Sequence, residues 1–341
     1  MRPFSILLKP VGSACNLNCS YCFYSSHPSG AISEETLSKM LSSYADLPFS
    51  GKSVTLQGGE PLLAPDYVFD ALEAYPLMRS LQTNATLLTP ETALRLKKAG
   101  WLVGASLDGD KIANRLRQTA SGDPSAAFEA AVAGIHLLED ANVDYNLLTV
   151  VSEANAGNAA EVYRYLRDHF KTRFHQYIEC TGPQNSITAG QWGDFLIALF
   201  DEWAKKDAYS VSIRIFDSIV SRLVRGEHTQ CSLAPRCDGY LVVEHDGSVY
   251  PCDFHVRKDL KLGNVLTHTW EEMLESGTYR RFAAAKTAPL PEKCRECPYV
   301  KFCNGDCPRS RRNSASVLCE GWRKFFAHSL ERFREIIESA P

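Results

Sequence analysis

Cysteine is the residue type in this sequence whose positions point most directly to chemistry. Of the 12 cysteines among 341 residues, all but Cys180 fall into three groups, whereas buried structural thiols would be scattered. The groups are Cys15, Cys19 and Cys22, then Cys231, Cys237 and Cys252, then Cys294, Cys297, Cys303, Cys307 and Cys319. Thiolates at short spacings bind zinc or iron–sulfur clusters. The sequence therefore predicts metal sites in both halves of the chain.

The first group has three and then two residues between its thiols, and it follows a predicted first strand. Three thiolates on a four-iron cluster leave one iron open to a substrate. A structural zinc site needs a fourth ligand, and His27 is the only local candidate. A cluster is the favoured interpretation, and zinc with His27 is the alternative.

The overall composition excludes several classes of protein. The chain is 45% hydrophobic and 23% charged, which is typical of globular proteins. A net charge of -3 argues against nucleic-acid binding by phosphate neutralisation. No apolar run approaches the roughly 18 residues of a membrane helix, and the apolar start is too short for a signal peptide. We expect a cytoplasmic protein without nucleic-acid or membrane partners, in which thiols stay reduced.

The elements that must position these residues alternate through the first two thirds of the chain. Strands are predicted at 5–9, 53–57, 79–83, 102–106, 145–150 and 174–178, and helices at 33–45, 66–75, 90–99, 125–141, 158–170 and 190–206. Serial strand–helix units predict parallel strands in an open sheet or an incomplete barrel. The loops after the strands then share one functional face.

The pattern changes after about residue 208. One more strand is predicted at 211–216, and 241–244 and 248–250 flank Asp246-Gly247, which is a hairpin signal. The Cys-rich stretch to Cys319 has few apolar residues, so we expect metal to organise it. Residues 309–312 carry three arginines that are interpreted as a solvated face, and a final helix is predicted at 322–337. The predicted units are residues 1–208, 209–230, 231–319 and 320–341.

Residues 15–24, with the sequence CNLNCSYCFY, resemble the signature of the radical S-adenosylmethionine (SAM) enzymes. The resemblance implies an α/β fold with a partial (β/α)6 barrel of TIM type. It also implies a [4Fe–4S] cluster on Cys15, Cys19 and Cys22 whose open iron chelates SAM. Reductive cleavage of SAM then yields methionine and a 5′-deoxyadenosyl radical.

Loops after the next strands resemble the family's SAM-contacting segments. Residues 57–61 (QGGEP) are similar to the GGEP motif that contacts the SAM amino group, although alone they predict only a tight turn. Residues 82–85 (QTNA) resemble a QTNG-like segment, with Ala85 where glycine is usual. Asp108, after the fourth strand, is alternatively a helix cap, and Arg117 is alternatively a solvated residue. The candidate cofactor-binding residues are Tyr24, Gln57, Gly58, Gly59, Glu60, Ser106 and Arg117.

The eight cysteines of the second half make two complete four-thiolate sites, for which zinc is acceptable. Their pattern resembles the SPASM extension of radical SAM proteins, which implies two auxiliary [4Fe–4S] clusters and hence three in all. Carried over from the family, one ligand set is Cys231, Cys237, Cys252 and Cys307, and the other is Cys294, Cys297, Cys303 and Cys319. A fully ligated cluster is suited to electron transfer. Cys180 is interpreted as a small buried hydrophobe, or alternatively as a thiol lining a pocket.

Residues 242–256 (VVEHDGSVYPCDFHV), 212–217 and 80–84 resemble the anaerobic sulfatase-maturating enzymes, and the similarity covers nearly the whole chain. The resemblance implies oxidation of a Cys or Ser in a Cys-x-Pro-x-Arg or Ser-x-Pro-x-Arg motif to Cα-formylglycine. Asp253 matches the family's proposed catalytic base, with a solvated or cluster-supporting carboxylate as the alternative. Tyr24 and Gln57 either orient the substrate or Asp253, or simply pack. The implied partners are an unfolded or nascent sulfatase and an electron donor such as flavodoxin or ferredoxin.

Two other functions stay open at this point. One is a SPASM maturase of another ribosomal peptide that makes thioether or carbon–carbon crosslinks; the cluster loop begins at residue 15, which leaves little room for an N-terminal peptide-recognition domain. The other is a zinc-binding or electron-carrying scaffold without radical chemistry.

Overall fold

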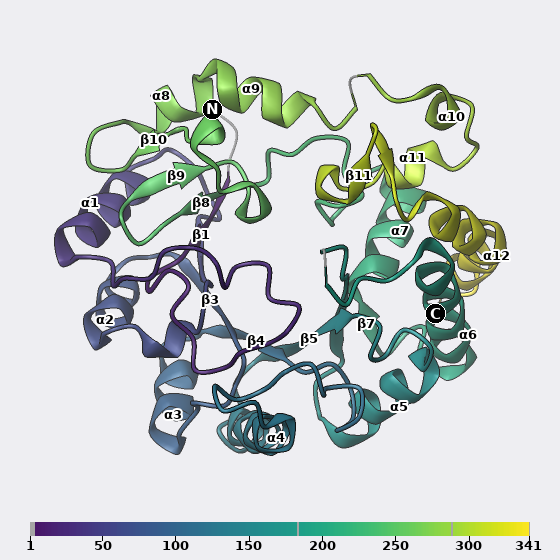
Figure 1. The fold of residues 1–341 in the computed structure, drawn as a ribbon, viewed down its shortest axis with the longest axis horizontal. Helices are drawn as coiled ribbons and strands as arrows, with labels where there is room; N and C mark the ends of the chain where they lie inside the picture. The colour runs from purple at the N-terminus through teal and green to yellow at the C-terminus, as the bar shows by residue number, and fades with distance from the viewer. Residues whose placement is uncertain (1–3, 183, 288, 341) are drawn as a thin grey trace.

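A single curved sheet forms the centre of the molecule in the computed structural model, which describes residues 4–182, 184–287 and 289–340. Figure 1 shows helices on the outside of this sheet. The strand order is β10-β9-β8-β1-β2-β3-β4-β5-β6-β7. The strands are β1 (Ser5–Leu8), β2 (Ser53–Leu56), β3 (Met78–Thr83), β4 (Leu102–Ser106), β5 (Tyr145–Val151), β6 (Phe174–Glu179), β7 (Ser212–Ile213), β8 (Tyr240–Val243), β9 (Ser248–Tyr250) and β10 (Gly263–Asn264).

Strands β1 to β6 are neighbours in sequence order, and every pair among them is parallel. The helices of these six units are α1 (Glu34–Ala45), α2 (Asp66–Ala74), α3 (Pro90–Lys98), α4 (Pro124–Asp140), α5 (Ala159–His169) and α6 (Ala189–Lys206). This arrangement confirms the predicted partial (β/α)6 barrel. It places the loops that follow the strands at one end of the barrel.

Local capping explains where several helices begin. The side chains of Ser33 and Thr89 accept hydrogen bonds from the backbone N–H groups of Thr36 and Thr92. Thr188 forms a complete capping box with Gln191 at the start of α6. Such caps satisfy N–H groups that have no partner inside the helix. The helix starts predicted near Ser33 and Thr89 are confirmed.

The segment after residue 208 differs from the prediction of a strand over 211–216. Strand β7 holds two residues, and helix α7 (Arg214–Arg225) begins directly after it. Ile215, Phe216 and Ile219 recur at helical spacing and are buried, and the Phe216 ring packs 5.2 Å from that of Trp203 on α6. Burial of one face of α7 against α6 therefore outweighs the β propensity of these residues.

The predicted hairpin is confirmed, and it continues the barrel sheet. Strands β8 and β9 pair antiparallel around a turn in which Gly247 has φ +78°. Strand β8 also pairs in parallel with β1, and β10 pairs with β9 at the edge. The second Cys group is thereby brought beside the strand that leads into the first.

The described part of the remaining Cys-rich stretch folds into short helices and one small hairpin. These elements are α8 (Trp270–Glu275), α9 (Gly277–Ala284), α10 (Glu292–Arg295), α11 (Val300–Cys303), β11 (Arg311–Arg312) and β12 (Ala315–Ser316), with the 3-10 turns η2 (Asp253–His255), η3 (Lys258–Leu260) and η4 (Pro308–Ser310). A further 3-10 turn, η1 (Pro61–Leu63), follows β2 in the barrel half. The proposed unit boundaries at 208, 230 and 319 stay predictions, and residues 1–3 and 341 lie outside the described part.

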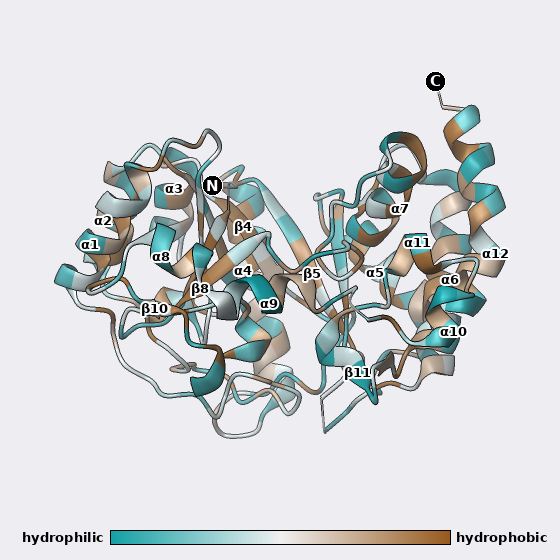
Figure 2. Ribbon diagram, turned by 90° about the horizontal axis from the view of Figure 1, so that it is seen from above, coloured by the Kyte–Doolittle hydropathy of each residue, from teal (hydrophilic) through white to brown (hydrophobic). Residues whose placement is uncertain are grey.

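The last helix, α12 (Cys319–Glu338), packs along α6. Its buried face includes Phe326, Leu330 and Phe333, which recur at helical spacing. Figure 2 shows the alternation of hydrophobic and hydrophilic residues along α7 and α12. No helix in the described ranges is both long and apolar enough for a membrane span.

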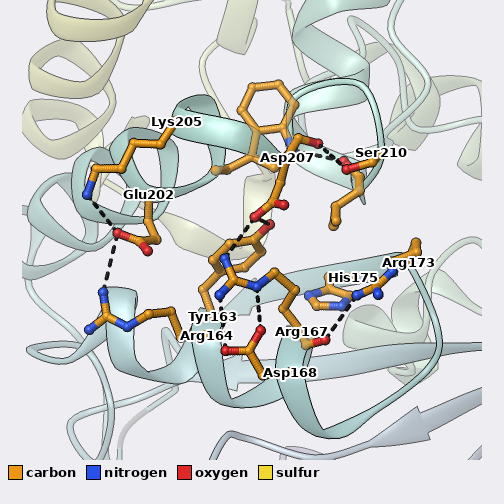
Figure 3. A network of polar contacts seen from close by, with 12 residues as sticks. Tyr163, Arg164, Arg167, Asp168, Arg173, His175, Glu202, Lys205, Asp207 and Ser210 are labelled. Atoms are coloured by element: carbon orange, nitrogen blue, oxygen red, sulfur yellow. Dashed lines mark hydrogen bonds and ion pairs between the residues drawn. The ribbon is translucent and has the colours of Figure 1, made fainter.

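A polar network joins α5, β6 and α6 on the outer side of the barrel (Figure 3). Arg167 lies at its centre and donates to Asp207 at 2.9 Å and to Asp168 at 2.7 Å. The Tyr163 hydroxyl also donates to Asp207, at 2.8 Å. These contacts satisfy buried charges, so we assign the network a structural role.

Candidate active site

A cavity of about 710 Å³ opens at the end of the barrel where the strands finish. Its volume lies in the range of small-molecule and cofactor sites. One wall is built by loops after β1 to β4, and another by β6, the loop that follows it and two residues of the Cys-rich half, Phe254 and Arg309. The cavity therefore has room for more than one ligand, between the two halves of the chain.

Cys15, Cys19 and Cys22 all line this cavity. Two backbone hydrogen bonds hold their loop against the segment after β4. The N–H of Asn18 donates to the carbonyl of Gln118 at 2.8 Å, and the N–H of Ser20 donates to that of Leu116 at 3.0 Å. Burial raises the pKa of the Cys19 thiol to about 11. Metal binding at this thiol must therefore release its proton.

The donor set fits a cluster with one open iron. Three thiolates face a common cavity. His27, the alternative fourth ligand, also lines this cavity, and its ring stacks on Tyr24 with centroids 4.4 Å apart. Within the described ranges, no three His, Cys, Asp or Glu side chains converge closely enough to hold a single metal ion. A four-iron cluster takes each thiolate on a different iron, so this finding concerns single-ion sites only.

Gly58 and Gly59 bring the loop after β2 against the cysteine loop. The N–H of Gly59 donates to Gly12 at 2.8 Å, and that of Glu60 donates to Ala14 at 2.8 Å. A Cβ atom on Gly59 would lie 1.9 Å from the Ala14 carbonyl oxygen. Glycine is thus required for this close approach of two backbones.

Glu60 lies behind the cavity wall and is fully buried. Its carboxylate accepts from the Leu62 N–H at 3.0 Å, the Thr83 hydroxyl at 2.7 Å and the Asn84 N–H at 2.8 Å. Desolvation raises the pKa of Glu60. The carboxylate ties two cavity loops together, and its contact with the SAM amino group stays a prediction.

Asp108 connects the predicted SAM-binding residues after β4. It accepts from Tyr21 at 2.5 Å, from Arg117 Nε at 3.2 Å and from the Val150 N–H at 2.9 Å. Ser106 and Arg117 both line the cavity, and Arg117 is buried rather than solvated. Asp108 is not a helix cap, since Asp123 caps α4. Tyr21 carried no signal of its own in the sequence.

Ala85, at the position where the family usually has glycine, adopts φ +65°. The left-handed conformation costs a residue with a Cβ atom about 1–2 kcal/mol. The chain therefore keeps the glycine-like backbone at this loop in spite of the alanine side chain.

Two charged residues beside the cavity were not found from the sequence. Lys9 is fully buried, donates to Gln57 at 3.0 Å, and has its ammonium 4.4 Å from the Tyr24 ring centroid. The Tyr24 hydroxyl donates to the carboxylate of Glu244, a buried residue that directly follows β8. Desolvation lowers the pKa of Lys9 and raises that of Glu244. Tyr24 and Gln57 thus line the cavity with fixed orientations.

Asp253 begins η2, directly after Cys252, and is buried, so its solvated alternative does not hold. Its carboxylate accepts from the Tyr240 hydroxyl at 2.9 Å. The next residue, Phe254, lines the cavity and packs against Phe23 with ring centroids 4.3 Å apart. Asp253 therefore lies next to the cavity, and its role as a base stays a prediction.

The cysteines of the second half gather in two places. A cavity of about 20 Å³ is lined together by Cys294, Cys297, Cys303 and Cys319. The other four are Cys231, Cys237, Cys252 and Cys307. Cys231 lies within electrostatic range of Cys237, and Cys252 within range of Cys307. The Lys286 ammonium connects the two pairs, because Cys231, Cys237 and Cys307 all act on its pKa. Burial raises the pKa of Cys303 and of Cys307 to about 12. The donor chemistry fits two clusters, and the carried-over ligand sets stay predictions.

The structure also bears on the sequence interpretations of Cys180 and of the arginines of 309–312. Cys180 is buried and also lines the large cavity, so both of its interpretations describe its position. The arginines of 309–312 are not a uniform solvated face. Arg311 donates to the backbone oxygens of residues 304–306, Arg309 lines the cavity, and Arg312 alone of the three is exposed. Arg309 and Arg311 are thus partly buried, whereas Arg312 is exposed.

Comparison with protein families gives two matches. The Radical SAM superfamily model matches residues 10–166, and an iron–sulfur cluster-binding SPASM domain model matches residues 231–298.

Related proteins and solved structures agree with these matches. A serine-type anaerobic sulfatase-maturating enzyme of Bacteroides thetaiotaomicron is 31% identical, covering 96% of this chain and 89% of the relative. A cysteine-type enzyme of Clostridium perfringens is 32% identical, covering 97% and 98%. The structure of native anSMEcpe with bound AdoMet and Cp18Cys peptide has a TM-score of 0.92 at 30% identity and covers 100% of both chains. Streptococcus suis SuiB bound to S-adenosylmethionine shares the fold, with a TM-score of 0.66 at 16% identity over 89% of this chain and 73% of that one.

Proposed function

We propose, from the premise that this chain belongs to the anaerobic sulfatase-maturating enzymes of the radical SAM superfamily, that it oxidises a Cys or Ser of a sulfatase to Cα-formylglycine. The family assignment makes it a SAM- and [4Fe–4S]-dependent enzyme and removes the alternative of a scaffold without catalysis. Both Cys-type and Ser-type relatives are about equally similar, so the proposal covers both residues.

The observation that carries the proposal is the two-sided cavity. Its barrel wall holds the three grouped thiols, the glycine loop, Ser106 and Arg117, and its other wall includes Phe254 and Arg309 of the SPASM half. We assign the first wall to cluster and SAM, through Cys15, Cys19, Cys22 and the candidate cofactor-binding residues. We assign the second wall to the substrate peptide. A solved relative that holds AdoMet together with a peptide supports a site that takes both ligands.

When bound, SAM and the clusters would supply the radical that removes a hydrogen atom from the target Cβ and the acceptor for one further electron. The residues of the chain must then orient the target side chain, exclude water and take up a proton. We assign the proton to Asp253, which is buried and held by Tyr240. A general base must reach the proton through a hydrogen bond or a single water. Tyr24 and Gln57, fixed by Glu244 and Lys9, would orient the target side chain.

The partners follow from this chemistry. The target residue must enter a cavity inside a barrel, so we propose an unfolded or nascent sulfatase as substrate. A small electron-transfer protein such as flavodoxin or ferredoxin would reduce the enzyme, and the cytoplasm is the proposed location. We further propose that the eight SPASM cysteines hold two auxiliary clusters in the sets named above.

The direct test uses reconstituted enzyme, SAM, a chemical reductant and a peptide with a Cys-x-Pro-x-Arg or Ser-x-Pro-x-Arg core, without oxygen. We expect an aldehyde on the peptide, detected by mass spectrometry and by hydrazide labelling. Cleavage of SAM without aldehyde formation on either peptide would reject the sulfatase substrate while leaving the radical SAM assignment in place.

A further inference from the structure

Arg309 is a partly buried cation that lines the part of the cavity assigned to the substrate. It belongs to η4 and follows Cys307 by two residues, and its side chain is 16% exposed. The guanidinium carbon lies 3.8 Å from the centroid of the Phe254 ring. One of its nitrogens, Nη2, donates to the Glu179 carbonyl at 2.8 Å and lies 3.4 Å from the Glu179 carboxylate. These contacts fix the plane of the guanidinium inside the cavity wall.

The hydrogen bonds of Arg309 leave donors unused. A guanidinium carries five N–H donors on three nitrogens. Among the described residues, both hydrogen bonds of the Arg309 side chain are donated by Nη2, so Nε and Nη1 donate none. These two nitrogens are also not among the buried polar atoms without a partner, which means that they are not fully buried. Nε and Nη1 are therefore accessible, on a residue that lines the cavity.

A purely structural ion pair would have a different geometry. Buried Arg–carboxylate pairs that offset their desolvation cost are usually bidentate and satisfy their remaining donors. Here a single nitrogen serves both the carbonyl and the carboxylate of Glu179. By contrast, Arg311, two residues away, directs Nε and Nη2 to three backbone carbonyl oxygens. Arg309 is held in place but not fully satisfied, as expected of a group that awaits a ligand.

We propose that Arg309 is a substrate-positioning residue whose free N–H groups bind a main-chain carbonyl of the peptide. This inference rests on the proposed function, because it requires a peptide in the second half of the cavity. A peptide carbonyl is the matching ligand class, since the Glu179 carboxylate beside Arg309 already balances its charge and disfavours a second anion. The SPASM half would thereby bind and orient the peptide backbone in addition to holding clusters.

The test compares Arg309→Gln with wild-type enzyme, using reconstituted protein and the sulfatase-type peptide. We expect the KM for peptide to rise about tenfold or more, as for loss of a hydrogen bond to a charged group. Iron content and SAM cleavage without peptide should stay unchanged. Arg309→Lys should restore little, because an ammonium cannot reproduce the planar donor pair. Arg334→Gln, which changes an exposed arginine on α12 paired with Glu331, is the matched control and should behave as wild type.

The double variant Glu179→Gln/Arg309→Gln separates peptide binding from mere charge balance. If Arg309 only neutralises Glu179, removing both charges restores the wild-type KM and overturns the inference. If Arg309 binds peptide, the KM stays high in the double variant. An unchanged KM in Arg309→Gln, measured while wild type forms aldehyde, overturns this inference alone. Wild-type enzyme that neither binds nor converts the peptide overturns the proposed function and this inference together.

Discussion

At the scale of single residues, the site depends on buried and partly buried charges that are each held by a specific partner. Arg117 is held by Asp108, Arg309 by Glu179, and Lys9 lies between Gln57 and the Tyr24 ring. Burying a charge costs free energy unless it is paired or hydrogen-bonded. Each of these pairs therefore fixes the direction of a side chain that lines the cavity or contacts its wall.

Asp253→Asn tests the assignment of the base. The variant should still cleave SAM but form aldehyde roughly 100-fold more slowly, because the amide cannot take up the proton. The measurement is 5′-deoxyadenosine by chromatography together with aldehyde by mass spectrometry. Asp259→Asn, an exposed carboxylate six residues on, is the matched control. An aldehyde yield equal to wild type would remove Asp253 from this role.

At the scale of elements, close backbone contacts join the C-terminal helix to the barrel. A Cβ atom on Gly321 of α12 would lie 2.2 Å from the Ala189 carbonyl oxygen on α6. The Trp192 and Trp322 rings flank this crossing, with centroids 5.7 Å apart. The contact matters for the site because α12 begins at Cys319, a proposed cluster ligand.

Gly321→Ala should lower the free energy of unfolding by about 1–3 kcal/mol, because the added methyl forces two helix backbones apart. Gly190→Ala is the control in α6, where a Cβ atom would meet nothing closer than 3.9 Å. The control should leave stability unchanged or raise it slightly. Equal urea midpoints for the two variants, measured anaerobically, would contradict the close contact.

His175 on β6 makes the barrel sensitive to acid. It is buried, and its pKa is lowered to about 4, chiefly by desolvation. Arg173 and Arg167 also lower this pKa, whereas Asp207 and a backbone hydrogen bond involving Thr172 raise it. Because the unfolded chain binds a proton below about pH 6.5 and the folded chain does not, stability falls as the pH drops from 6.5 towards 4.

The expected loss between pH 7 and pH 5 is about 2 kcal/mol from this residue. Urea unfolding of wild type and His175→Gln at both pH values measures it. The variant should lose less stability on acidification than wild type. Parallel losses in both proteins would show that His175 is protonated in the fold as readily as in the unfolded chain.

At the scale of the whole molecule, two halves of the chain meet across one cavity. The alternating pattern and the cysteine spacing were sufficient to predict the barrel strands, the hairpin and the cavity-lining thiols. They were not sufficient for Lys9, Tyr21, Glu244 and Arg309, because nothing local distinguishes a buried charge or hydroxyl from a solvated one. Arg309 and Glu179 are 130 residues apart, so no local pattern in the sequence links them.

The same two-sided architecture predicts the metal content. Reconstituted enzyme should hold about twelve irons per chain, from three four-iron clusters. Cys15→Ala should lose about a third of them together with all SAM cleavage, while the SPASM sites stay loaded. Cys180→Ala, at a cavity thiol outside the three groups, should keep the full iron content. Equal iron in wild type and Cys15→Ala would contradict a cluster at the first site.

The most direct test of the account follows one hydrogen atom from peptide to cofactor. A sulfatase-type peptide carrying deuterium on the target Cβ is incubated with enzyme, SAM and reductant without oxygen. The account predicts that deuterium appears in 5′-deoxyadenosine in step with aldehyde on the peptide. Unlabelled 5′-deoxyadenosine, or label transfer that leaves a crosslink in place of an aldehyde, would contradict it.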